Sequence, residues 1–160
     1  IGNTFCVLVA LLKGGWYGGI AGAVGMTIAD LMDPVYITVA PKTFVLKLCI
    51  GLITGLVAHK IAKINESTDR KYVFKWSVIA SAAGLAFNVV ADPLVGYFYK
   101  QFILGQPQQM AEVLAKMSAF TTLFNAVVSV ILVGFLYNAV RPALIKMQVL
   151  VISPKEARKA

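Results

Sequence analysis

Long apolar stretches separated by short polar breaks run through the whole chain. Five stretches stand out, at 1–12, 16–32, 43–60, 73–91 and 117–140. A helix that crosses a membrane needs about 20 mostly apolar residues, with a range of about 17–25. The last four stretches reach that length, and the first has about two-thirds of it. We therefore predict an all-α, polytopic membrane helix bundle with five segments.

Turn-forming residues mark the breaks between these segments, because Gly, Pro, Asn and Asp favour turns. The breaks lie at 13–15, 33–41, 62–72 and 105–109. Proline interrupts the hydrogen-bonding pattern of a helix, so Pro93 is expected to end or kink the fourth segment, which otherwise extends as far as Ile103. Pro142 follows the fifth segment directly. Positions 1–151 are predicted to form one membrane domain, followed by a basic tail at 152–160.

The composition excludes an ordinary water-soluble fold. Of the 160 residues, 59% are hydrophobic and 14% are charged, and the mean hydropathy is +0.78. A soluble domain has roughly 45–50% apolar and about 25% charged residues. Disorder and a coiled coil are excluded for the same reason.

The net charge of +8 is explained by topology and needs no nucleic-acid partner. If successive segments cross the membrane in alternate directions, the breaks at 13–15 and 62–72 and the region after Val140 share one side. That side holds eleven of the 15 lysines and arginines: Lys13, Lys60, Lys63, Arg70, Lys71, Lys75, Arg141, Lys146, Lys155, Arg158 and Lys159. The other side holds Lys42, Lys47, Lys100 and Lys116. By the positive-inside rule the first side, with the C-terminus, is cytoplasmic.

The sequence offers little for catalysis. His59 is the single histidine, and Cys6 and Cys49 lie in apolar runs, where a thiol usually acts as a small buried hydrophobe. There is no phosphate-binding loop GxxxxGK[ST], no GxSxG and no HExxH. We therefore expect no catalytic residues, no metal site and no cofactor bound by this chain.

Polar and small residues recur on one face of each long segment. Such groups are costly at membrane depth and usually face the protein interior or a cavity. At a spacing of three or four residues the stripes are Thr43, Lys47, Gly51, Gly55 and His59; Ser77, Ser81, Gly84, Asn88 and Asp92; and Ser118, Thr122, Asn125 and Ser129. This pattern indicates a bundle with lipid outside and a partly polar centre.

Lys47 lies six residues after Pro41, about 9 Å into its helix at 1.5 Å per residue. Three interpretations are open: snorkelling of the ammonium to the outer interface, an internal ion pair with Asp30 or Asp92, or contact with a ligand. Asp92 precedes a proline, so an Asp-Pro turn is an alternative role for that carboxylate.

Amides inside apolar helices need hydrogen-bond partners, so Asn88 and Asn125 either bridge helices or recognise a ligand. We predict a ligand site between the outer halves of the third, fourth and fifth segments, covered by the loop 33–41. The expected polar contacts are Lys47, Asn88 and Asn125, with Thr43, Asp92 and Thr122 behind them. Tyr36, Phe87 and Tyr97 are candidate aromatic walls, with core packing or interfacial anchoring as the alternative.

Small residues four apart allow helices to approach closely. The pairs are Gly15 with Gly19, Gly18 with Gly22, and Gly51 with Gly55. They indicate helix packing within the chain or, alternatively, docking onto another membrane subunit.

The ordered set of these features resembles the substrate-binding S component of an energy-coupling factor (ECF) vitamin transporter. The residues that carry the resemblance are GGWYGGIAGAVGMTIADLMDP, YITVAPKTFVLKLCIGLITGLVAHKIAK and the final helix with FNAVVS. The motif formed by Ala40, Pro41, Thr43, Phe44 and Lys47 resembles the riboflavin-type branch. That branch includes proteins assigned to hydroxymethylpyrimidine or pyridoxine.

The resemblance implies a bacterial membrane protein with six helices, one of them ahead of Ile1. It also implies a complex with a transmembrane coupling subunit and two cytoplasmic ATPases that use ATP. The expected ligand is a small B vitamin or precursor, with pyridoxine or hydroxymethylpyrimidine ahead of riboflavin. The alternatives are a self-sufficient oligomeric transporter or channel and a membrane-embedded enzyme. The enzyme would need an acidic pair with a histidine or a metal set, which the sequence lacks.

Overall fold

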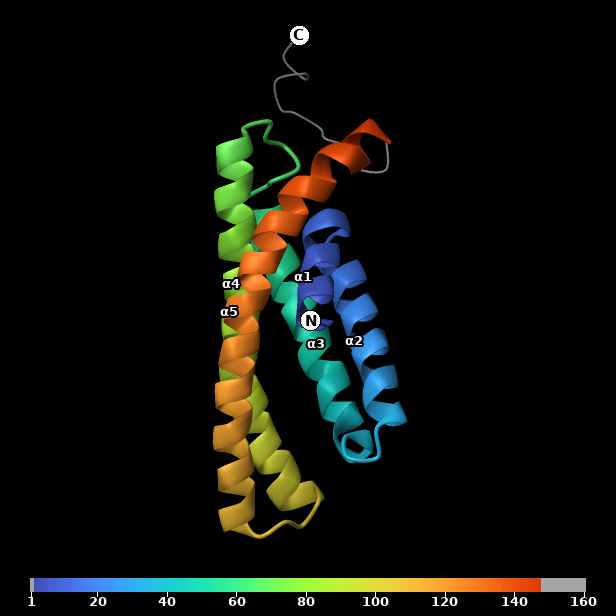
Figure 1. Ribbon diagram of the computed structural model, residues 1–160, viewed down its shortest axis with the longest axis vertical. Coiled ribbons are helices and arrows are strands. Elements are labelled where there is room, and N and C mark those ends of the chain that lie inside the picture. The colour runs from blue at the N-terminus through green and yellow to red at the C-terminus, as the bar shows by residue number, and fades with distance from the viewer. Residues whose placement is uncertain (1, 148–160) are drawn as a thin grey trace.

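The computed structural model describes residues 2–147, which form an all-α helix bundle, as predicted (Figure 1). The helices are α1 (Gly2–Lys13), α2 (Gly15–Met32), α3 (Ala40–Gly55), α4 (Arg70–Phe98) and α5 (Gln108–Lys146). A 3-10 turn, η1 (Ile37–Val39), precedes α3, and π-helical turns extend α3 as η2 (Leu56–Ile61) and α4 as η3 (Tyr99–Ile103).

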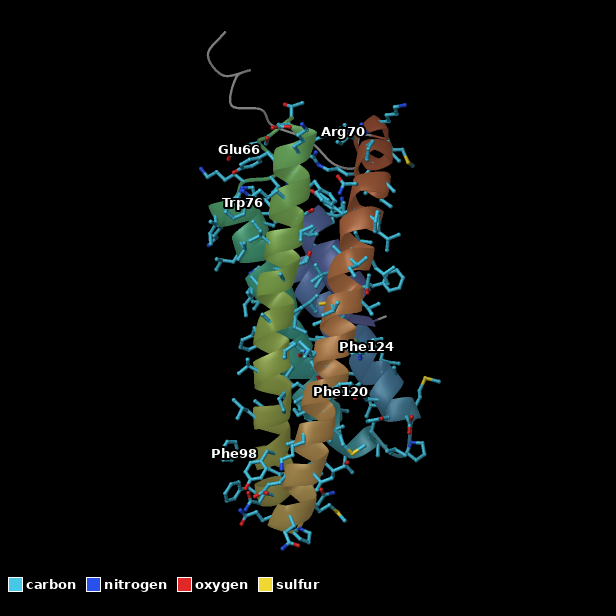
Figure 2. The ribbon with its side chains drawn as sticks, turned by 60° about the vertical axis from the view of Figure 1, so that its left-hand side comes forward. Glu66, Arg70, Trp76, Phe98, Phe120 and Phe124 are labelled. Carbon is cyan, nitrogen blue, oxygen red and sulfur yellow. The ribbon has the colours of Figure 1, made fainter. Side chains whose placement is uncertain are left out.

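Three continuous helical stretches are long and apolar enough to cross a membrane, at Ile37–Ile61, Arg70–Ile103 and Gln108–Lys146. The helix α2 (Gly15–Met32), predicted at 16–32 to cross the membrane, is not among them, and the helix Gly2–Lys13 is apolar but shorter. Large apolar side chains cover much of the outer surface, and Figure 2 shows two of them, Phe120 and Phe124, on α5. A surface of this kind suits contact with lipid, and the chain is a multi-pass membrane protein.

The turns gather at two opposite ends of the bundle (Figure 1). One end holds the α1–α2 turn, the α3–α4 connection and the end of α5; we call it the α1–α2 end. The other holds the α2–α3 and α4–α5 connections and is called the α4–α5 end. Figure 2 shows Arg70 at the first end and Phe98 at the second. This is the grouping of breaks that the sequence predicted, and the tail 152–160 lies outside the described residues.

The fourth segment extends to Ile103, one of its predicted alternatives, whereas the boundaries of the fifth segment differ from the predicted ones. Pro93 lies inside α4, which continues through it and through η3 to Ile103, so no Asp-Pro turn forms at Asp92. Membrane helices tolerate proline because neighbouring groups satisfy the freed carbonyls. Likewise α5 begins at Gln108, well before Met117, and contains Pro142 rather than ending ahead of it.

Glycines set the contact between α2 and α3. A Cβ on Gly51 would collide with the backbone of Gly19, and a Cβ on Gly55 would collide with Gly15. The two helices therefore approach to backbone contact, which only glycine permits here. The predicted small-residue pairs serve packing within the chain at this contact.

The contact between α1 and α2 is equally close. Gly18 lies against the backbone of Ala10, and Gly22 lies against the side chain of Cys6. Cys6 is buried as expected, and its Sγ is 3.4 Å from the Gly18 carbonyl oxygen. Cys49 is only half-buried, so the expectation of two buried thiols is wrong for it. Its position on α3 leaves part of the thiol at the bundle surface.

The predicted polar stripe of α4 faces the interior. Ser77, Ser81 and Asn88 are buried, and the two serine hydroxyls donate to carbonyl oxygens of their own helix, Phe74 at 2.8 Å and Ser77 at 2.6 Å. Bonds of this kind allow a hydroxyl to sit inside an apolar bundle. Asn88 Oδ1 has no hydrogen-bond donor among the described residues, so this side chain is a candidate for binding a ligand.

Candidate functional site

Four polar side chains from three helices meet toward the α4–α5 end; we call them the polar cluster. Its centre is Asp92 of α4, whose Oδ1 accepts a hydrogen bond from Lys42 Nζ of α3 at 2.8 Å. Asp92 Oδ2 accepts hydrogen bonds from Ser118 Oγ and, at 3.3 Å, from Thr122 Oγ1, both on α5. One carboxylate therefore ties α3, α4 and α5 together.

Local sequence explains this arrangement. Asp92 follows Asn88 by one helical turn, so both lie on the interior face of α4. Ser118 and Thr122 have the same spacing on α5, and Thr122 Oγ1 is also 2.6 Å from the Ser118 carbonyl oxygen. Lys42 lies in the first turn of α3, from which its long side chain reaches Asp92. The side chains of Lys42 and Asp92 are 10% and 17% exposed, so the ion pair is largely shielded from solvent.

Two members of this cluster, Lys42 and Ser118, were not among the predicted site residues. Lys42 is next to Thr43 in the sequence, so it is off the face that Thr43 and Lys47 share, and no periodicity marks it. Ser118 was on a predicted stripe but had no assigned role. Of the three interpretations left open for Lys47, an ion pair with Asp92 does not form among the described residues, because Asp92 bonds to Lys42 instead. The sequence does place Lys42 directly before the apolar segment that begins at Thr43. From there its long side chain can reach into the membrane-embedded part of the bundle.

Helices α3 and α4 run antiparallel, and two contacts fix their register. Gly84 packs against Thr54, and Lys42 Nζ lies 3.2 Å from where a Cβ on Gly96 would stand. Lys47 is about midway between Thr54 and Lys42 along α3. By this register Lys47 faces α4 near position 91, about one helical turn from Asn88 on the interior face.

Lys47 and Asn88 are buried without a full set of partners. Lys47 is 7% exposed, and no hydrogen-bond acceptor for its Nζ is present among residues 2–147; Asp92 and Asp30 are within electrostatic range. Asn88 is 1% exposed, and its Oδ1 has no hydrogen-bond donor in the described part of the chain. Most buried polar groups in proteins are hydrogen-bonded. The pair is therefore suited to bind a polar ligand.

Helix α1 brings two more polar side chains to the interior. Thr4 Oγ1 donates to Ser129 Oγ of α5 at 3.0 Å. Asn3 is buried, and its Oδ1 also lacks a partner among the described residues. Asn3 was not singled out from the sequence because the first segment is too short for its interior face to be assigned.

Thr43 and Thr122 are buried on the predicted faces of α3 and α5, whereas Asn125 is exposed. Asn125 lies one turn from Ser129 on the same side of α5. The prediction that its amide lies inside the bundle is wrong for the described structure, although Thr122 and Ser129 on the same side of α5 are buried. The exposure also leaves Asn125 without a helix-bridging hydrogen bond in the described structure.

The three candidate aromatic walls are not gathered around the polar cluster. Tyr36 is exposed in the α2–α3 turn, and Phe87 is partly exposed on α4. Tyr97 stands edge-on to Phe98, with ring centroids 5.3 Å apart, and lines a cavity of about 340 Å³ between α4 and α5. The covering loop is instead fastened by Tyr99, whose hydroxyl donates to the Thr38 carbonyl oxygen at 2.9 Å.

No group of three or more His, Cys, Asp or Glu side chains suited to hold a metal ion occurs within residues 2–147.

A family model described as "ECF-type riboflavin transporter, S component" matches residues 1–142. No curated protein and no solved structure matches the chain. The stretch matched by the family model contains the polar cluster, Lys47, Asn88 and Asn125.

Proposed function

Since the chain belongs to the family of ECF-type riboflavin transporter S components, as its match over residues 1–142 shows, we propose that it captures a small B vitamin or vitamin precursor from outside the cell. Members of this family are substrate-binding subunits of ECF vitamin transporters and are not enzymes.

The observation that carries the proposal is the pair of buried polar side chains, Lys47 on α3 and Asn88 on α4, about one helical turn apart along the bundle; Asn88 Oδ1 has no hydrogen-bond donor among the described residues. A lysine ammonium offers three donors, and an asparagine amide both donates and accepts. A flat heteroaromatic ring with an acceptor for Lys47 and a donor for Asn88 complements them. Binding pockets of this kind are mostly apolar with a few placed polar groups.

We place Asn125 and Thr43 at the rim of this site and Asp92 and Thr122 behind it. Asp92 holds Lys42, Ser118 and Thr122, so it acts by fixing α3, α4 and α5 around the ligand. Tyr36 and Tyr97 are assigned to the covering region at the α4–α5 end. Neither has a recorded contact with Lys47 or Asn88.

Three vitamins fit this chemistry. Pyridoxine and hydroxymethylpyrimidine are small rings with hydroxyl donors and ring-nitrogen acceptors, and the sequence resemblance favours them. Riboflavin is the ligand that the family's description names. All three carry a donor for Asn88 and an acceptor for Lys47, so these two contacts do not distinguish them. A direct comparison of their binding does.

The binding experiment titrates purified protein with each vitamin and repeats the titration with Lys47→Ala, Asn88→Ala and Asn125→Ala. Loss of a hydrogen bond to a buried partner costs about 1–3 kcal/mol, which is roughly a 5- to 150-fold loss of affinity. Lys116→Ala is the control, because Lys116 is an exposed lysine of α5 in the same half of the bundle. If a vitamin binds these three variants as tightly as the original protein, the proposed site is wrong.

We also propose that uptake requires a transmembrane coupling subunit and two cytoplasmic ATPases, which consume the ATP. The family implies these partners, and the chain has no phosphate-binding loop of its own. The alternative is a self-sufficient oligomeric transporter. Vesicles that contain only this protein should bind the vitamin without accumulating it; accumulation in them would support the alternative.

A further inference from the structure

A further cavity lies at the α1–α2 end, between the beginning of α4 and the end of α5. Its volume is about 260 Å³. It is lined by Thr68, Arg70, Asn138, Arg141, Pro142 and Ile145. Among residues 2–147, two arginines and no carboxylate line this cavity, so it suits an anion.

Arg141 is the best evidence for such a ligand. Its side chain is buried, with 7% of the residue exposed, and Nη2 donates to the carbonyl oxygens of Ile64 at 3.1 Å and Ser67 at 3.2 Å. Its Nε is buried and has no acceptor among the described residues. Carbonyl oxygens do not neutralise a guanidinium charge, and a buried charge without a counter-charge is costly.

The acidic side chains nearest in sequence are engaged elsewhere. Glu66 Oε1 is 3.9 Å from Lys63 Nζ, and Asp69 Oδ1 accepts a hydrogen bond from the Lys71 backbone N–H at 2.9 Å. The two salt bridges recorded for the described residues involve neither Arg70 nor Arg141. The cavity also adjoins the N-terminus of α4, where the helix dipole favours negative charge.

The position of the cavity relative to the membrane indicates which molecule supplies the anion. The apolar stretch of α5 ends at Val140, directly before Arg141, and that of α4 begins at Val73, three residues after Arg70. Both arginines therefore lie where the hydrocarbon layer meets the phosphate groups of one leaflet. Pro142 and Ile145 supply an apolar wall beside them.

We propose that this cavity binds a phosphate group, held by Arg70 and Arg141, and that the phosphate belongs to an anionic phospholipid. The planar guanidinium fork matches the geometry of phosphate oxygens. Basic pockets between membrane helices on the cytoplasmic side bind such headgroups. The bound lipid anchors the end of α5 to the α3–α4 connection, which Arg141 already contacts.

The test is native mass spectrometry of the purified full chain with added phosphatidylglycerol, phosphatidylcholine or inorganic phosphate. The variant is Arg70→Gln, because Arg70 is exposed and its replacement removes no hydrogen bond recorded within the described residues. Lys75→Gln is the control, since it removes an equal charge from an exposed position of α4 outside the cavity. Vitamin binding by each variant checks that it is folded.

The expected result is selective binding of phosphatidylglycerol that weakens about fivefold in Arg70→Gln and stays unchanged in Lys75→Gln. Binding of inorganic phosphate with the same dependence on Arg70 would support the site but identify a soluble ligand. Equal binding of the two lipids without phosphate binding, or equal weakening by both variants, would overturn the proposal.

Discussion

Lys42 Nζ lies 2.8 Å from Oδ1 of Asp92 and joins the first turn of α3 to the interior face of α4. Both side chains are mostly buried, and the second carboxylate oxygen is occupied by hydroxyls of α5. The ion pair thus closes the α4–α5 end of the bundle. Lys42 also neutralises the charge of Asp92. Because both carboxylate oxygens are already bonded within the protein, we expect other side chains to recognise the vitamin.

Breaking this ion pair should destabilise the protein strongly. Removing one partner of a buried pair costs about 3–5 kcal/mol, because it leaves an uncompensated charge; with partial exposure we expect about 3 kcal/mol for Asp92→Asn. The measurement is denaturant unfolding in micelles for Lys42→Gln, Asp92→Asn and the double variant. The coupling energy of this cycle should exceed about 1 kcal/mol.

Lys63 and Glu66 provide the matched control cycle. Their side chains are 48% and 36% exposed and 3.9 Å apart, so their coupling should be below about 1 kcal/mol. Equal coupling in the two cycles would contradict the structural role of Lys42 and Asp92.

The hydroxyl of Tyr99 should slow the release of the vitamin. It donates to the Thr38 carbonyl oxygen at 2.9 Å and so fastens the loop ahead of α3 to η3. A net hydrogen bond is worth about 0.5–1.5 kcal/mol, so Tyr99→Phe should speed dissociation about 2- to 12-fold in a stopped-flow measurement. Tyr72→Phe is the control, because that hydroxyl bonds to the Ala62 carbonyl oxygen at the opposite end. Equal acceleration by both variants would show that the effect is not local to the loop.

The spacing of polar residues predicted the structural features that depend on a single helix. The buried stripe of Ser77, Ser81 and Asn88 and the burial of Lys47 follow from a spacing of three or four residues and the cost of polar groups in lipid. The role of Lys42 depends on the register between α3 and α4, which no single segment reveals. The exposure of Asn125 depends on which helices pack against that part of α5, which a single segment does not reveal either.

The two ends of α5 were predicted wrongly for a related reason, whereas the helical stretch of α4 ends at Ile103, one of the predicted alternatives. Pro93 breaks an isolated helix, but in a bundle the neighbouring helices compensate for the lost hydrogen bond, so α4 continues. The helix α5 extends beyond its apolar stretch to Gln108 and Lys146, because hydropathy marks only the part that suits lipid.

The α1–α2 end should face the cytoplasm. Ser67→Cys in the α3–α4 connection is expected to resist an impermeant thiol reagent added to intact cells, whereas Gln109→Cys at the α4–α5 end should react. The physical reason is the excess of lysine and arginine at the first end. The unmodified protein gives the background from Cys6, which is buried, and Cys49, which is half-buried. Labelling of Ser67→Cys from outside would reverse the orientation.

The packing of α2 on α3 should make Gly51 intolerant of any side chain. A Cβ at Gly51 collides with the backbone of Gly19, which cannot move without shifting the whole helix. Overpacking costs typically 1–3 kcal/mol, so Gly51→Ala should lower the unfolding midpoint and the yield of folded protein. Gly25→Ala is the matched control, because a Cβ there meets nothing within 4 Å. If both variants unfold like the original protein, α2 and α3 do not lie at backbone contact.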